Sequence, residues 1–415
     1  MKNSLSLSSQ LINRKESIIE YFSSLTKDNL PFYTSVDLRY SGYKAAVIDT
    51  NLFPAGFNNI CLEDIQLNLD MLKEEIILNF PKTKNIGIIM ESHTRNQYYL
   101  LNLLHLFSFI EKAGFQVKIF AFLPDIDPKG ENLKLMNGQE IMIHSFSRHA
   151  FHKIDLFVLN NDLINGIPHD LNSCKIPVVP SFKAGWHSRL KSTHFKSLNH
   201  EINLFCNHFN LDPWQFNCEF SHVDNVDINN EKDKFNLACE VEMLLKKIQN
   251  RYDEYAINDI PFLFLKADSG TYGMGVQAIL HPEDIINLNR KSRNKLSKGK
   301  GNQKISKFIL QEGVYTRNHI NKAIAEPCIY QIKDQYLGAF FRSHQNKTEQ
   351  DCLNSVGMEF TKLCLPHQSC FNINENICNE SDFFLFQILA KLASHACKKE
   401  CIVYENQNQE AAVLS

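Results

Sequence analysis

Apolar runs in the first half of the chain alternate with stretches of helical periodicity. Residues 85–90 form a continuous apolar run, and residues 95–113 then carry apolar side chains at helical spacing up to Gly114. Further short, β-rich runs bounded by polar residues follow at 117–122, 154–159 and 176–179. Strands and helices that alternate in this way are typical of an open, mostly parallel α/β sheet.

Polar residues follow three of these predicted strands. One group comes directly after the first strand, residues 160–162 follow another, and the segment 180–195 follows the last. Ligands bind outside the carboxyl ends of the strands in such sheets. The candidate binding residues at these strand ends are Glu91, Arg95, Asn96 and Arg189.

A simpler explanation exists for any one of these strand ends. Ser92 or Thr94 would cap the following helix, and Arg95 would be solvated. Three strand ends of the same mixed-charge character together favour a site for a small zwitterionic ligand.

Residues 36–59 are dense in polar side chains, with aromatic residues between them and two glycines that allow tight turns. We expect such a stretch to add little to a hydrophobic core. Its amides and charges suit a loop that binds the carboxylate and ammonium groups of an amino acid, and an irregular structural loop is an equal alternative. The candidate substrate-binding residues are Asp37, Arg39, Lys44, Asn51, Asn58 and Asn59, and Asp49 is a further charged residue of the stretch.

The second half of the chain contains a lysine and a glycine-rich turn between two apolar runs. A helical stretch at 233–255 precedes the segment 262–280, in which Lys266 ends the first run and three glycines follow at 270, 273 and 275. Backbone N–H groups of a loop without side chains can close on phosphate oxygens, and the lysine supplies positive charge. The spacing G-x-x-G-x-G differs from both common nucleotide motifs, so the segment predicts a strand, a flexible flap and a second strand. We expect ATP as the ligand, while the glycines alone would also fit a loose hairpin.

Further strands are predicted beyond the flap. Residues 307–314 form a strand that turns polar at Gln311 and Glu312, which suits contacts with the adenine and ribose of a nucleotide. Residues 325–332 and 336–342 predict a hairpin that ends in a charged arginine, Arg342. Asn354 to Gly357 then predicts another turn.

A basic run at 290–304 contains seven lysines or arginines and no acid. It would fit a nucleic-acid patch, but a short basic run without interleaved aromatic residues favours a solvated, mobile surface loop. The formal charge of −2 for the whole chain also argues against bulk binding of nucleic acid, which generally needs a strong basic excess.

Composition indicates a globular chain of two or three domains, since 44% of its 415 residues are hydrophobic and 22% are charged. We expect a cytoplasmic protein, because the N-terminus lacks the apolar core of a signal peptide and no run approaches 18 apolar residues. The twelve cysteines are scattered from Cys61 to Cys401, which favours thiols over a disulfide framework. The alternative is a structural zinc at Cys364 and Cys370, or at Cys397 and Cys401, with nearby histidines.

These segments together resemble a known family, the proteobacterial type of glutamate-cysteine ligase, whose second half is a variant of the ATP-grasp fold. The resemblance spans most of the chain in the family's order. It is carried by residues 36–59, 91–96, HSRLKSTHF at 187–195, DPW at 212–214, KADSGTYGMGV at 266–276, QEGVYT at 311–316, AEPCIY at 325–330, GAFFR at 338–342 and LNSVGM at 353–358.

The resemblance implies an α/β fold with two main domains. An N-terminal, open and mostly parallel α/β domain of the pre-ATP-grasp kind would cover residues 1–195 and bind substrate. An α+β ATP-grasp-like domain with the glycine-rich flap would cover 196–415 and bind nucleotide, with a flap subdomain at about 215–310.

The resemblance also implies a reaction. ATP would drive the joining of the γ-carboxyl of L-glutamate to the amino group of L-cysteine through an acylphosphate, as the first step of glutathione synthesis. Another ATP-grasp carboxylate–amine ligase, such as a glutathione-synthetase-like enzyme, is the alternative, and a non-catalytic nucleotide sensor is a third. A flap that excludes water from the acylphosphate and cations that neutralise the transferred phosphoryl group both fit this chemistry.

The resemblance assigns roles residue by residue. Lys266 and Arg342 would be catalytic, because they are the cations best placed for the phosphoryl group. Magnesium is implied, with Glu326 and Asn354 as its candidate ligands. ATP would contact Lys266, Ser269, Gly270, Thr271, Tyr272, Gly273, Met274, Gly275, Gln311, Glu312, Gly313 and Val314.

Overall fold

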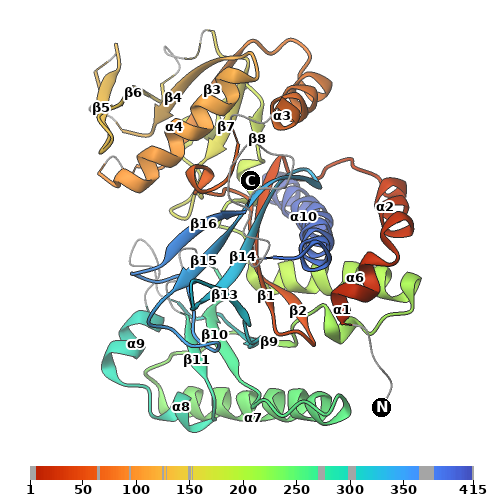
Figure 1. Cartoon of the computed structure of the whole chain (residues 1–415). Coiled ribbons are helices and arrows are strands. Elements are labelled where there is room, and N and C mark those ends of the chain that lie inside the picture. Colours follow the sequence, from red (N-terminus) through yellow and green to blue (C-terminus); the bar gives the residue numbers. More distant parts are fainter. Residues whose placement is uncertain are drawn as a thin grey trace.

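The computed structural model contains three β-sheets, which follow one another from the top to the bottom of Figure 1. It describes residues 6–62, 66–92, 95–123, 126–127, 129–147, 151, 153–269, 276–297, 305–363 and 378–413, and for 401–413 it describes the backbone alone.

The first sheet has the strand order β5-β6-β4-β3-β7-β8, and its neighbouring strands are parallel except for β5 and β6. Its core is tightly packed at β3, since a Cβ on Gly87 would lie 2.4 Å from the ring of Phe157. The predicted open, mostly parallel sheet is therefore confirmed. Its strands are β3 (Asn85–Met90), β4 (Gln116–Ala121), β5 (Glu131–Lys134), β6 (Glu140–Ser145), β7 (Leu156–Asn160) and β8 (Val178–Val179), and the helices along this part of the chain are α3 (Gln66–Asn79), α4 (Gln97–Lys112), α5 (His169–Asn172) and η3 (Phe182–Ala184).

The second sheet is antiparallel, with the order β16-β15-β14-β1-β2 and with β13 paired to β14. It confirms the predicted hairpin of β14 and β15. The division of the chain near residue 195 stays a prediction, and this sheet combines strands from both sides of that position. Its strands are β1 (Tyr33–Tyr40), β2 (Ala45–Asn51), β13 (Asn318–Ile320), β14 (Ala323–Ile332), β15 (Gln335–His344) and β16 (Glu359–Leu363).

The expectation of a loop at residues 36–59 was wrong for its first part. That part is the hairpin of β1 and β2, and only the short η1 (Phe57–Asn59) and its flanks lack strand structure. Val36 and Leu38 are fully buried on one face of β1, while the polar Asp37 and Arg39, which alternate with them, point to the other face. The polar residues mark the second face of a strand.

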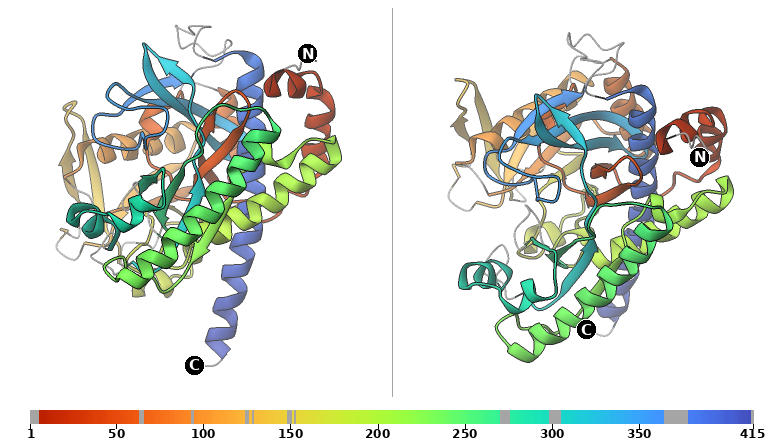
Figure 2. Two further views of the ribbon diagram at one scale, coloured as in Figure 1. Left: turned by 90° about the horizontal axis from the view of Figure 1, so that it is seen from below. Right: turned by 60° about the horizontal axis from the view of Figure 1, so that its bottom comes forward.

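Four helices pack with this second sheet: α1 (Leu7–Ile12), α2 (Lys15–Ser24), α6 (Lys191–Phe209) and α10 (Glu380–Val413). Phe205 of α6 and Phe386 and Leu389 of α10 belong to the same buried cluster as Val36 and Leu38. The last part of α10 projects beyond the body of the molecule (Figure 2, left).

The third sheet is antiparallel, with the order β11-β10-β12-β9. β10 and β11 pair with each other, which confirms the predicted strands on both sides of the flap; Gly270 to Gly275 lie outside the described residues. The elements of this region are η4 (Pro213–Gln215), β9 (Phe220–Val223), α7 (Glu231–Glu254), β10 (Leu263–Ala267), β11 (Gln277–Ile279), α8 (Glu283–Ile286), α9 (Arg290–Ser297) and β12 (Phe308–Glu312).

The first half of the basic run was wrongly expected to be a loop, because residues 290–297 form α9. Asn289 accepts a hydrogen bond from the N–H of Ser292 in the first turn, at 2.9 Å. Leu296 is buried in the core of the third sheet and anchors the helix. Residues 298–304 lie outside the described part.

The cysteines are mostly free thiols, as expected. Within the described residues, Cys174, Cys206, Cys218, Cys239, Cys328, Cys352, Cys378 and Cys397 are free, whereas Cys61 is disulfide-bonded and departs from the expectation. The side chains of Cys364, Cys370 and Cys401 lie outside the described part. Among the described helices, none has the length and apolar character needed to cross a membrane.

Candidate active site

A cavity of about 610 Å³, its opening included, is lined by strands of both antiparallel sheets and by the start of α6. Its walls combine carboxylates with lysines and arginines. The lining residues are Asp37, Arg39, Ile48, Asp49, Lys191, Phe264, Lys266, Ala267, Val276, Glu326, Arg342, Cys352 and Asn354.

Four of these side chains form an arginine–carboxylate network across β1, β14 and β15. Glu326 lies opposite Arg342 in the strand register and accepts from its Nη1 at 2.8 Å. The other carboxylate oxygen of Glu326 accepts from Nε of Arg39 at 3.0 Å, and Asp37 accepts from both Nη atoms of Arg342 at 3.3 Å. Burial alone would lower the pKa of Arg342, but the carboxylates of Asp37 and Glu326 raise it well above its usual value.

Arg342 has hydrogen-bonding capacity to spare. Its Nε is buried and has no partner among the described residues. A buried N–H without an acceptor is costly, so an anionic oxygen that enters the cavity would meet a charged donor already free of water.

The outer edge of β2 is held by two cations. β2 stands at one end of the strand order, so the carbonyl groups on its outer side have no neighbouring strand within the described sheet. Nζ of Lys266 donates to the carbonyl of Ile48 at 3.0 Å, and Nη1 of Arg189 donates to the carbonyl of Thr50 at 2.6 Å. Lys266 belongs to β10, so this contact ties the third sheet to the second.

Asp49 stands between these two carbonyls, and its side chain is 39% exposed. Nζ of Lys191 donates to its carboxylate at 2.6 Å. Burial alone would raise the pKa of Asp49, but the charges of Lys191 and Lys266 outweigh it and lower the pKa. Asp49 is therefore an ionised carboxylate with an open side.

The start of α6 is fixed to the end of β10 by Asp268. The backbone carbonyl of Asp268 accepts from the N–H of Lys191 at 2.8 Å, and its carboxylate accepts from the N–H and hydroxyl of Ser192, both at 2.7 Å. An acid at a helix N-terminus is also favourable to the helix dipole. These contacts bring Lys191 to the cavity beside Lys266.

Lys266 is buried and also donates to Oε1 of Gln311 on β12 at 2.5 Å. Burial lowers its pKa, which the charge of Asp49 opposes in part. Nε2 of Gln311 is buried without a partner among the described residues. Lys266 lines the cavity, and Gln311 holds it from the neighbouring strand β12.

The residues after Gln311 are held more firmly. Glu312 is fully buried, and both of its carboxylate oxygens accept from Nζ of Lys44 at 2.7 Å. Burial raises the pKa of Glu312, against the opposing charge of Lys44. The N–H of Gly313 donates to the carbonyl of Phe262 at 2.8 Å. A Cβ on Gly313 would lie 2.3 Å from the aromatic ring of Phe262, so the backbone packs closely against that ring.

Comparison with known proteins identifies the family. The family of glutamate-cysteine ligases named GshA matches residues 8–401, which is nearly the whole chain.

The chain belongs to this family. It is an ATP-dependent glutamate-cysteine ligase, which forms γ-glutamylcysteine in glutathione biosynthesis. The alternatives of another carboxylate–amine ligase and of a nucleotide sensor are thereby set aside.

Solved structures agree with the family assignment. A crystal structure from Methylobacillus flagellatus KT, named "Putative gamma-glutamylcysteine synthetase", is 33% identical with a TM-score of 0.85 over 95% of each chain. A D-alanyl-alanine synthetase A from Vibrio cholerae O1 biovar eltor str. N16961 is 9% identical with a TM-score of 0.28, over 75% of this chain and 98% of that one, a likeness too weak to support a conclusion. Among the curated proteins no sequence matches.

In the ligase, the cavity brings together predicted residues from five of the segments that carry the resemblance. The lining includes both predicted catalytic cations, both predicted metal ligands and two of the predicted substrate-binding residues: Lys266, Arg342, Glu326, Asn354, Asp37 and Arg39. Their individual roles stay predictions.

The other predicted substrate-binding residues do not line this cavity. Asn96 caps α4 by accepting from the N–H of Tyr99 at 3.3 Å, and Arg95 is exposed. The helix cap therefore exists, but Asn96 forms it instead of Ser92 or Thr94. The remaining members of this set are Lys44, Asn51, Asn58, Asn59, Glu91 and Arg189.

Each of these residues has a partner within the protein. Oε1 of Glu91 accepts from the N–H of Asp162 at 3.0 Å, and Oδ1 of Asn51 accepts from the N–H of Phe53 at 3.0 Å. Nδ2 of Asn58 donates to Oδ1 of Asn59 at 3.0 Å. Their role in substrate binding stays a prediction.

The predicted flap begins and ends at the cavity. Ala267 before it and Val276 after it both line the cavity, and Ser269 is exposed. The residues 270–275 themselves lie outside the described part, so their predicted ATP contacts stay predictions.

Asp49 and Lys191 are cavity residues that the predicted site did not include. Asp49 occurs in the polar stretch 36–59, and it lies directly opposite Asp37 in the hairpin of β1 and β2. Recognising that hairpin from the alternation of Val36, Asp37, Leu38 and Arg39 would have placed both carboxylates on one face. Lys191 belongs to the polar segment 180–195 that follows a predicted strand, and Asp268 holds its helix start at the cavity.

Proposed function

We propose that the cavity between the two antiparallel sheets is where ATP, glutamate and cysteine react. The observation that carries this proposal is that Lys266 and Arg342 line one cavity with the carboxylates of Asp37, Asp49 and Glu326, although the strands that carry them are far apart in the sequence. The fold around it would be the ATP-grasp-like arrangement, in which a nucleotide lies between two sheets under a flap.

Lys266 and Arg342 neutralise the transferred phosphoryl group in this proposal. The γ-carboxylate of glutamate attacks the γ-phosphorus of ATP, ADP leaves, and an acylphosphate forms. The amino group of cysteine then attacks the acyl carbon, and phosphate leaves. The first step moves negative charge across the phosphoryl group to the leaving ADP, and the second builds it on the acyl oxygen and then on the leaving phosphate. Preorganised cations in a partly dry site stabilise such charge strongly.

The residues present fit a magnesium ion. Asp37, Asp49 and Glu326 offer carboxylate oxygens and Asn354 an amide oxygen on the same cavity, which are the ligands that Mg²⁺ prefers beside phosphates. Asp37 and Asp49 are cross-strand partners, and Asp49 is the more open, so we add both to Glu326 and Asn354 as candidates. When bound, the ion would neutralise phosphate charge.

The walls supply the remaining roles. Gln311 and the backbone up to Val314 continue β12 away from Lys266, which supports the proposal that adenine and ribose lie along this strand. The flap at 269–275 would cover the cavity and keep water from the acylphosphate. Because the reaction uses ATP, we expect it to take place in the cytoplasm.

An isotope experiment tests the acylphosphate. Glutamate labelled with ¹⁸O in its γ-carboxylate should transfer one labelled oxygen to the released phosphate, because that oxygen bridges carbon and phosphorus in the intermediate. Mass spectrometry of the phosphate measures the transfer, with α-carboxyl-labelled glutamate as the matched control. Unlabelled phosphate from γ-labelled glutamate at full turnover would exclude the acylphosphate.

A further inference from the structure

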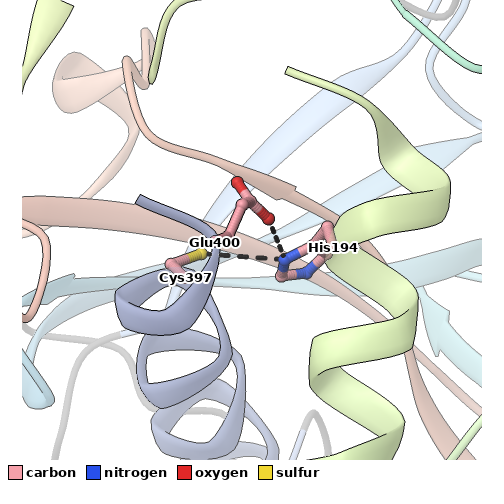
Figure 3. A group of neighbouring side chains, drawn as sticks. All are labelled: His194, Cys397 and Glu400. Atoms are coloured by element: carbon pink, nitrogen blue, oxygen red, sulfur yellow. Dashed lines mark hydrogen bonds and ion pairs between the residues drawn. The ribbon is translucent and has the colours of Figure 1, made fainter. Parts of the chain in front are cut away.

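A cluster of three buried side chains lies behind β2, between α6 and α10. His194, Cys397 and Glu400 offer donor atoms that all lie within 4.8 Å of one another (Figure 3). Nδ1 of His194 lies 3.0 Å from Oε2 of Glu400 and 3.8 Å from Sγ of Cys397. These three ligand types at these separations would suit a metal ion, so their other contacts decide what the cluster does.

Arg189 already supplies the positive charge of this cluster. Its Nε donates to Oε1 of Glu400, and its Nη2 lies 3.5 Å from Oε2 of Glu400 and 3.8 Å from Sγ of Cys397. Arg189 and Glu400 are both buried to 1% exposure or less. Glu400 already has Arg189 as its counter-ion, so a divalent ion at this cluster would have to displace a buried ion pair.

The histidine supports an ion-pair network in place of a metal site. Burial lowers the pKa of His194, against the opposing effect of Glu400, so the ring is neutral at neutral pH. Burial alone would raise the pKa of Glu400, but the charge of Arg189 and the hydrogen bond from His194 outweigh it and lower the pKa. A carboxylate only accepts, so the neutral ring donates from Nδ1 to Glu400.

The network reaches the cavity through β2. Nη1 of Arg189 donates to the carbonyl of Thr50, the residue directly after Asp49. The ring of Trp186 lies between the two cations of this region, 4.8 Å from the guanidinium of Arg189 and 4.6 Å from Nζ of Lys191. A displacement of Arg189 would therefore also move or loosen β2, the strand that carries Asp49.

We infer that Glu400 and Arg189 are positioning residues, which fix β2 so that the carboxylate of Asp49 stands correctly in the cavity. Edge strands lack a neighbour on one side, and here a buried guanidinium replaces it. Glu400 keeps that guanidinium in place from α10, and His194 orients Glu400. The inference rests on the proposed function, in which Asp49 faces the reacting groups.

A double-mutant cycle tests this inference. Glu400→Gln keeps the size of the side chain and removes its charge, so Arg189 loses its counter-ion and Asp49 is no longer held. We expect kcat/KM for ATP to fall about tenfold in Glu400→Gln, and by no more than about twofold when Asp49 is already Asn. A further tenfold loss in the Asp49→Asn background would overturn the inference and leave the proposed function intact.

Asp334→Asn is the matched control. Like Glu400, Asp334 is a buried carboxylate beside a histidine: its Oδ2 lies 3.4 Å from Nε2 of His395 on α10. Unlike Glu400, it lies at the turn between β14 and β15. We expect it to lower Tm about as much as Glu400→Gln without changing kcat/KM per folded molecule. Equal kinetic effects of the two variants would mean that Glu400 is merely structural.

Two further readouts are independent of turnover. The chain has two tryptophans, so the tryptophan fluorescence of Trp214→Phe reports on Trp186 alone. The wavelength of this fluorescence should shift when Glu400→Gln is added and stay unchanged when Asp334→Asn is added. Stoichiometric zinc in the purified wild-type protein, lost in Cys397→Ala, would overturn the network in favour of a metal site. Full activity of Asp49→Asn would instead refute the proposed role of Asp49 itself.

Discussion

Polar side chains at the edge of the parallel sheet and in the cavity differ in what they bond to. At the sheet edge they hold backbone: Glu91 accepts from the N–H of Asp162, and Nδ2 of Asn160 donates to the carbonyl of Pro54 at 2.7 Å. In the cavity they mainly hold one another, as Asp37 holds Arg342. Lys266 and Arg39 hold backbone carbonyls in the cavity as well, but the pair of Asp37 and Arg342 can exchange partners with a ligand without breaking a backbone contact.

This difference explains why the cavity suits chemistry on a charged substrate. Its cations and Glu326 are already removed from bulk water, so a phosphate with its metal ion can replace these internal partners at little further desolvation cost. The helix cap at Asn96 has no such freedom, because its loss leaves a helix end unsatisfied. Substitutions should therefore affect activity in the cavity and stability at the sheet edge.

The largest effect should follow from Lys266→Ala. We expect turnover to fall by roughly two orders of magnitude or more, on the scale of losing a preorganised charge contact. Steady-state release of phosphate measures it, with circular dichroism to confirm folding. Lys307→Ala, which removes a half-exposed lysine from the same sheet region, is the control and should retain nearly full turnover. Equal losses in both variants would remove the special role of Lys266.

The pH dependence should identify Lys266 more finely. Burial lowers its pKa, so in the free enzyme the ammonium loses its proton below the usual value of 10.5, and positive charge disappears from the cavity as pH rises. We expect the alkaline limb of kcat/KM for ATP to begin below pH 10.5 in the wild type. Lys266→Arg should move that limb to higher pH, since arginine stays protonated. An unmoved limb would assign it to another group.

The smallest effect on activity should come from the sheet edge. Asn96→Ala removes the cap of α4 and should cost about 1 kcal/mol of stability, the usual value for such a cap. Thermal unfolding measures this loss, and kcat/KM for both amino acids should stay within twofold of the wild type. A large rise in KM for glutamate or cysteine would restore Asn96 to the substrate site.

Local patterns predicted the parts of the fold that repeat a simple period. The apolar run of β3 and the helical spacing of α4 each determine one element, and Lys266 before the glycines located the two strands on either side of the predicted flap correctly. The family resemblance then gave the reaction. These features are readable because each depends on a few neighbouring residues.

Long-range pairing hid the rest. β1 was misjudged because Asp37 and Arg39 face a polar cavity, and their partners Arg342 and Glu326 lie 305 and 287 residues away along the chain. Lys191 reaches the cavity only because Asp268 holds the start of α6. Neither arrangement leaves a mark in a window of neighbouring residues, so both required the tertiary structure.

One matched pair of substitutions tests the central claim most directly, that the chemistry takes place in the cavity and not at the edge of the parallel sheet. Arg342→Gln and Arg95→Gln make the same change in the two regions, at a cavity residue and at an exposed one. The measurement is kcat/KM for ATP per folded molecule. We expect a loss of roughly a hundredfold or more for Arg342→Gln, on the scale of a lost transition-state contact, and less than about twofold for Arg95→Gln. Equal losses, or a larger loss for Arg95→Gln, would contradict the account.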